Sequence, residues 1–81
     1  MSNTIVRSNW AGLESMEFGE YQYIQLAFRF TSNGFREYWV QWGFGEDDQH
    51  SEMYASEYDD NKRLAYSLYY EKAEELVDRF A

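Results

Sequence analysis

The chain has 81 residues, no cysteine and a formal net charge of −8 at pH 7. This length predicts one small domain, and the lack of thiols excludes disulfides and cysteine-ligated zinc. The negative charge argues against binding nucleic acid or anionic membranes through phosphate neutralisation.

The N-terminal part of the chain carries only weak structural signals. Thr4 to Ser8 is compatible with a short strand, and Trp10, Leu13 and Met16 are spaced as one face of a helical turn, although Gly12 weakens a helix. Met1–Thr4 lacks the ordered regions of a secretory signal, and no apolar run approaches the roughly 20 residues that span a bilayer. We therefore expect a cytoplasmic protein without a membrane segment.

A β-hairpin is predicted at about 21–31 and 35–44, because apolar and polar residues alternate on both sides of Ser32-Asn33-Gly34. A two-residue Asn-Gly turn would set Phe30 opposite Glu37 and so pair apolar with polar residues. A three-residue loop instead makes both faces consistent. We therefore predict that loop, with Gly34 left-handed in a bulge and with these cross-strand pairs: Phe28–Tyr38, Leu26–Val40, Ile24–Trp42 and Arg29–Glu37.

A C-terminal helix is predicted at about 61–80, where one apolar stripe recurs at helical spacing. The stripe consists of Ala65, Leu68, Tyr69, Ala73, Leu76, Val77 and Phe80. Asp59, Asp60 or Asn61 is expected to cap the helix, and Glu75 and Arg79 are spaced as an ion pair. With a third strand near 52–58, the fold class is α+β: a small antiparallel sheet with one helix packed on one face, in a single domain covering 1–81.

Residues 46–61 contain seven acids and no base, which accounts for most of the net charge. Such a local anionic segment suggests a surface that meets a basic partner. The predicted contacts are Glu46, Asp47, Asp48, Glu52 and Glu57. The alternative is a solvated loop that leads into a helix, where the acids at 59 and 60 favour the positive end of the helix dipole.

The hairpin face away from the helix is predicted to be aromatic and partly exposed, as a binding or dimer surface. Its candidate contacts are Tyr21, Tyr23, Phe35 and Trp39. The alternative is that the N-terminal segment covers this face with Ile5, Val6, Trp10 and Leu13. The tyrosines of the helix, Tyr66 and Tyr70, are interpreted as edges of the core.

Catalytic and metal chemistry have little support in the residue pattern. Asp48, His50 and Glu52 would share one face of an extended segment, as a metal site requires, but His50 is the only histidine. No nucleophile motif and no glycine-rich phosphate loop is present. We expect no enzyme activity, no bound metal and no cofactor.

In kind, this small acidic cysteine-free chain resembles the proteins with which phages block bacterial nucleases, including anti-CRISPR and anti-restriction proteins. The resemblance implies a non-enzymatic inhibitor, such as a nucleic-acid mimic, that sets carboxylates on a basic surface of a nucleic-acid-handling protein. It transfers no residue roles, because no motif carries it. The alternative function is a structural or assembly protein that forms a homodimer or larger homo-oligomer through the aromatic sheet face.

Overall fold

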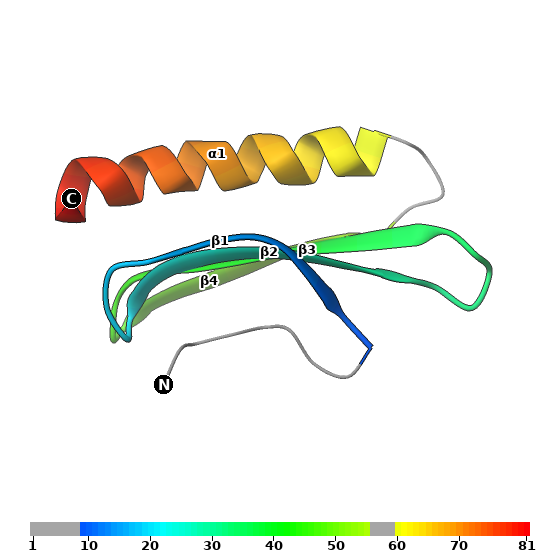
Figure 1. Ribbon diagram of the computed structural model, residues 1–81, viewed down its shortest axis with the longest axis horizontal. Helices are drawn as coiled ribbons and strands as arrows, with labels where there is room; N and C mark the ends of the chain where they lie inside the picture. The colour runs from blue at the N-terminus through cyan, green and yellow to red at the C-terminus, as the bar shows by residue number, and fades with distance from the viewer. Residues whose placement is uncertain (1–8, 56–59) are drawn as a thin grey trace.

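The computed structural model describes residues 9–55 and 60–81, which form a four-stranded antiparallel sheet and one helix (Figure 1). The strands follow one another in chain order across the sheet, and the helix lies along one face. This confirms the α+β class. The elements are β1 (Ala11–Glu17), β2 (Gln22–Phe30), β3 (Arg36–Gly45), β4 (Asp48–Ala55) and α1 (Asp60–Phe80).

The β2–β3 hairpin has the register predicted from its cross-strand chemistry. Ile24 pairs with Trp42, and Leu26 pairs with Val40. On the other face Arg29 pairs with Glu37, with 2.5 Å between the guanidinium Nε and the carboxylate Oε1. The three-residue loop is also confirmed, since the backbone N–H of Gly34 donates to the Thr31 carbonyl at 2.9 Å and Gly34 has a φ of +86°.

The N-terminal part of the described chain is a strand, so the prediction of a helical turn at Trp10, Leu13 and Met16 was wrong. In β1 the register with β2 shifts between Gly12 and Glu14, which leaves Leu13 as an extra residue. This bulge interrupts the two-residue alternation of a strand and produces the three-residue spacing that suggested a helix. The segment Thr4–Ser8 lies outside the described residues.

The third predicted strand exists but begins earlier, at Asp48 rather than near residue 52. Gly45 pairs with Asp48, so Glu46 and Asp47 form a two-residue connection at the tip of the β3–β4 hairpin. The register shifts between Gly43 and Gly45, which makes Phe44 the extra residue of a second bulge. The predicted strand end at 56–58 lies outside the described residues.

Helix α1 packs on the predicted sheet face, and the core lies between them. The buried core residues are Ile24, Leu26, Tyr38, Val40, Trp42, Ala65, Tyr69, Ala73 and Leu76. Two members of the predicted stripe, Val77 and Phe80, are instead exposed. Asn61 is buried at the start of the helix, whereas Asp59 lies outside the described residues. No helix in the described ranges has the length and apolarity needed to cross a membrane.

The predicted Glu75–Arg79 pair is replaced by other contacts. Glu75 accepts a hydrogen bond from the Lys72 ammonium at 3.0 Å, and the Arg79 guanidinium lies 4.3 Å from the ring centroid of Phe44. Both bases therefore bend from the helix toward the sheet. An aromatic ring competes well with an exposed carboxylate for a guanidinium, because each contact contributes only about 0.5–1 kcal/mol.

The sheet face away from α1 is more buried than the sequence suggested. Tyr23 and Ala27 are almost inaccessible, and Trp10 stacks on Trp39 with ring centroids 5.2 Å apart. The Arg29 guanidinium lies 4.6 Å above the Trp10 ring. The alternative, in which the N-terminal segment covers this face, thus holds for Trp10 but not for Leu13, which is exposed, while Ile5 and Val6 lie outside the described residues.

Candidate binding surface

Three segments that are distant in sequence meet at one end of the sheet. The β1–β2 connection (18–21) and the β3–β4 connection lie at the same end, because consecutive antiparallel strands reverse direction. The last turn of α1 also reaches this end, where the rings of Phe18 and Phe80 lie 6.5 Å apart. Figure 1 shows both hairpin turns below the C-terminus of the helix.

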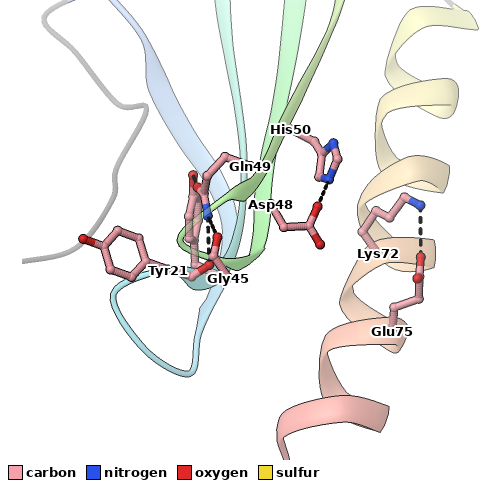
Figure 2. A network of polar contacts seen from close by, with 8 residues as sticks. Tyr21, Gly45, Asp48, Gln49, His50, Lys72 and Glu75 are labelled. Atoms are coloured by element: carbon pink, nitrogen blue, oxygen red, sulfur yellow. Dashed lines mark hydrogen bonds and ion pairs between the residues drawn. The ribbon is translucent and has the colours of Figure 1, made fainter.

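The side chain of Gln49 joins the two hairpin turns (Figure 2). Its amide nitrogen donates to the carbonyls of Tyr21, at 3.0 Å, and Gly45, at 2.6 Å. Its amide oxygen accepts a hydrogen bond of 2.8 Å from the hydroxyl of buried Tyr23. Both donors and the acceptor of this one side chain are therefore used, which holds the turns in a defined relation.

Gly43 leaves the space that Gln49 occupies. A Cβ at position 43 would lie 2.1 Å from the Gln49 amide nitrogen and 2.6 Å from the Tyr21 carbonyl oxygen. Both distances are too short for non-bonded atoms, so glycine is required here by close approach and not by its backbone angles. Gly45, in contrast, has open space around the same position.

A second polar layer lies on the helix side of β4. His50 contacts the carboxylate of Asp48, and its ring stacks on Trp42 with centroids 5.4 Å apart. The Lys72 ammonium lies 5.6 Å from the centroid of the same Trp42 ring. Figure 2 shows Asp48, His50 and Lys72 between β4 and α1. The Lys72 ammonium is matched here by the Glu75 carboxylate and the Trp42 ring, so it leaves the turns beyond it anionic.

The formal charges of the described residues separate along the molecule. We call the two hairpin turns and the last two turns of α1 the acidic end. It carries eight acids and one base, namely Glu17, Glu20, Glu46, Asp47, Asp48, Glu74, Glu75, Asp78 and Arg79. Among the described residues, the opposite end, at the β2–β3 loop and the start of α1, carries charges of both signs: Arg29, Arg36, Lys62, Arg63, Glu37 and Asp60.

The helix dipole has the same direction as this charge separation. Its negative C-terminal end, equivalent to about half an elementary charge, lies at the acidic end. The longest dimension of the molecule is 39 Å, several times the Debye length of about 8 Å at physiological salt. A partner at one end is therefore screened from the other end, and the acidic end acts as a separate electrostatic unit.

Two tyrosines of α1, Tyr66 and Tyr69, remain neutral over the physiological range. Burial raises the pKa of Tyr69 to about 12, and the nearby Glu14 carboxylate adds to the effect. Burial and Glu14 also raise the pKa of Tyr66. In contrast, the hydrogen bond to Glu75 raises the pKa of the Lys72 ammonium and keeps it charged.

The structure separates the predicted acidic contacts. Glu46 and Asp47 are exposed at the tip of the β3–β4 turn, and Asp48 is half-buried beside His50. Glu52 lies farther along β4, opposite Val40 and away from the tip. Glu57 lies outside the described residues. A continuous charge block in the sequence is therefore not one patch in space.

The predicted aromatic contacts are also divided. Tyr21 is half-exposed in the β1–β2 turn at the acidic end, whereas Phe35 is exposed in the β2–β3 loop at the opposite end. Trp39 packs on Trp10. The expectation that Tyr23 belongs to an exposed patch is contradicted by its 1% accessibility, which results from its place in a central strand.

Sequence reasoning missed the acids that other segments bring to the acidic end. These are Glu17, Glu20, Glu74, Glu75 and Asp78. If β1 had been recognised as a strand, Glu17 and Glu20 would have been included, because alternate turns of a meander lie at the same end of the sheet. The bulge at Leu13 concealed that strand.

The three residues considered as metal ligands in the sequence analysis do not form a cluster. Asp48 and His50 are in contact, but Glu52 does not complete a set with them. Within residues 9–55 and 60–81, no three acidic or histidine side chains are grouped closely enough to hold an ion.

No protein-family model, curated protein or solved structure matches this chain. We therefore infer its function from the geometry and the charges of the described residues.

Proposed function

We propose that this protein is a non-enzymatic binding inhibitor that sets its acidic end on a basic surface of a nucleic-acid-handling protein. The observation that supports this most is the meeting of acids from three separate segments beside the negative end of α1. A field of one sign at one end of a molecule speeds the encounter with a surface of opposite charge.

Glu46 and Asp47 are the centre of the proposed contact. They are exposed at a turn whose position is held by Gln49, so few degrees of freedom are lost when they bind. The turn places the neighbouring acids Glu46, Asp47 and Asp48 close together at one tip of the molecule. A groove that binds nucleic acid carries bases that neutralise phosphates, so it would accept such a group of carboxylates, as in phage anti-defence proteins. Tyr21 would supply an apolar contact beside them.

The test compares two variants that change the net charge equally. Glu46→Gln/Asp47→Asn removes two negative charges at the acidic end, and Ser32→Lys/Ser67→Lys adds two positive charges at exposed positions elsewhere. A partner is first captured from the host lysate on the wild-type chain at low salt and identified. The affinity of each variant for that purified partner is then measured, together with its competition against duplex DNA.

We expect the acidic-end variant to weaken binding at least about tenfold and the control less than about threefold, since only close charge pairs are strongly coupled. Wild-type affinity should also fall as salt rises. Equal losses in the two variants would show that net charge matters and that the acidic end does not. A captured partner that binds as well in the presence of saturating duplex DNA would contradict the proposed target class.

The alternative, a homo-oligomer formed through the aromatic sheet face, has less support. Tyr23 is buried, and Trp39 already packs on Trp10 within one chain. Light scattering on the purified wild-type chain measures its mass in solution, which gives the oligomeric state. A dimer that Trp39→Ala dissociates would favour the alternative over the inhibitor.

A further inference from the structure

Helix α1 lies off-centre on the sheet. Its packing is mainly against β2, β3 and β4, whereas β1 forms the outer edge of the sheet. The side of α1 near β4 is polar, with Lys72 reaching toward Trp42. The side near β1 carries a row of side chains one helical turn apart, and these are mostly apolar.

This row and the facing part of β1 form a surface that we call the β1 flank. Its residues are Met16, Phe18, Tyr66, Tyr70, Val77 and Phe80. Phe18 touches Phe80, and the Glu14 carboxylate lies near enough to Tyr66 to raise the pKa of its hydroxyl, so strand and helix residues are neighbours.

The β1 flank is open to solvent at several large apolar side chains. The exposed fractions are 39% for Phe18, 57% for Tyr70, 41% for Val77 and 40% for Phe80. Single exposed apolar residues are ordinary, but a row of them beside a free strand edge marks an interface. In the part of the chain that the structure describes, no strand pairs with the outer edge of β1. The backbone groups on that edge are thus available to another chain.

The charges on β1 indicate which partner fits this edge. The strand contains Glu14 and Glu17 and no base. Glu14 pairs with Leu26 and so lies on the helix side, whereas Glu17 pairs with Tyr23 and lies on the other side. A second copy related by a two-fold axis would bring these carboxylates close to their own counterparts, and like charges across neighbouring strands are destabilising.

We propose that the β1 edge binds an extended segment of a partner protein in which Lys or Arg alternates with apolar residues. The segment adds a fifth strand beside Glu14–Glu17, and the bulge at Leu13 limits pairing on the far side. Its basic residues lie on the side away from the helix and meet Glu17, and its apolar residues lie on the helix side, where they cover Met16 and the β1 flank beside Glu14. This surface is separate from the Glu46–Asp47 turn, so it goes beyond the proposed function.

The test uses a labelled synthetic peptide of about ten residues that alternates Lys and Val, as a minimal strand of this chemistry. The control peptide has the same sequence with every backbone amide N-methylated, which preserves the charge and abolishes strand pairing. Fluorescence anisotropy measures both affinities for the wild-type chain. We expect the unmethylated peptide to bind at least about tenfold more tightly, since backbone hydrogen bonds supply much of the affinity in strand addition. Equal affinities would overturn the proposal.

Two variants with equal charge change locate the peptide. Glu14→Lys/Glu17→Lys is expected to weaken peptide binding about tenfold or more, and Glu46→Lys/Asp47→Lys less than about threefold. Equal effects would show that attraction is not specific to β1 and would also overturn the proposal. Loss of binding to the natural partner in the second variant bears only on the proposed function, so the two hypotheses fail separately.

Hydrogen exchange on the wild-type chain needs no substitution and therefore does not depend on how the variants fold. Peptide binding should slow exchange of the outward amides between Glu14 and Glu17 and leave β4, the other edge strand, unchanged. Protection on β4 alone, or on neither edge, would contradict binding at β1.

Discussion

At the scale of single residues, one glutamine defines the geometry of the acidic end. Gln49 bridges two turns, and its position depends on the absence of a side chain at Gly43. It also accepts the hydrogen bond of buried Tyr23, whose hydroxyl would otherwise lack this partner. The turn that carries the exposed residues Glu46 and Asp47 is thus held in place by a side chain that contributes no charge.

Gly43→Ala and Gln49→Ala should each destabilise the fold by about 1–3 kcal/mol, the first by steric clash and the second by loss of hydrogen bonds. The double variant should lose less than the sum, because removing the glutamine frees part of the space that the alanine methyl needs. Urea denaturation measures all three free energies of unfolding. Ser51→Ala, on the same strand and face, is the control and should have little effect. Strict additivity would mean that the two positions are independent.

At the scale of elements, the hairpins are built differently. The β2–β3 loop uses a left-handed glycine as the last of its three residues, and the β3–β4 connection uses two residues next to a bulge at Phe44. The first arrangement follows from local pairing chemistry and was predicted. The second depends on where β4 begins, which the acidic residues at the tip do not indicate.

Two glycines give a matched test of this difference. Gly34→Ala should destabilise the protein by about 1–2 kcal/mol, because an alanine is strained at a φ of +86°. Gly45→Ala should change stability by less than about 0.5 kcal/mol, since Gly45 has no positive φ and nothing lies within 4 Å of the added Cβ. Thermal unfolding of both variants measures this contrast. Similar losses would contradict the left-handed assignment of Gly34.

At the scale of the whole molecule, the charge separation and the position of α1 produce the two surface regions for which we propose binding roles. The acidic end gathers acids from both hairpin turns and from the helix, while the β1 flank combines apolar side chains with a free strand edge. Neither region is continuous in sequence. Both depend on the helix crossing the sheet off-centre and ending above the two turns (Figure 1).

The helix–sheet interface should also determine the alkaline limit of stability. The pKa of Tyr69 is raised from 10 to about 12 in the folded chain, so between these values the unfolded chain releases a proton that the folded chain keeps. The contribution of Tyr69 to the free energy of unfolding should therefore be constant below about pH 9. It should fall as pH rises further, by about 2–3 kcal/mol at pH 12.

Urea denaturation at a series of pH values measures this fall. The pKa of Tyr23, Tyr54 and Tyr66 is raised as well, so the total fall should exceed the contribution of one group. Tyr69→Phe removes its share and should flatten the profile. An unchanged slope in that variant would place the titration elsewhere.

The sequence by itself determined the α+β class, the hairpin register and the buried part of the α1 stripe (Ala65, Tyr69, Ala73 and Leu76), because each depends on contacts between near neighbours or on simple periodicity. The contact between Asp48 and His50 also follows from the sequence, because every second side chain of a strand lies on the same face. The acidic end and the β1 flank required the tertiary structure. A bulge at Leu13 hid one strand, and only the meander and the path of the helix bring Glu20, Glu46 and Asp78 to one end. Charge counted along the chain is local, whereas the electric field at a surface depends on distance in space.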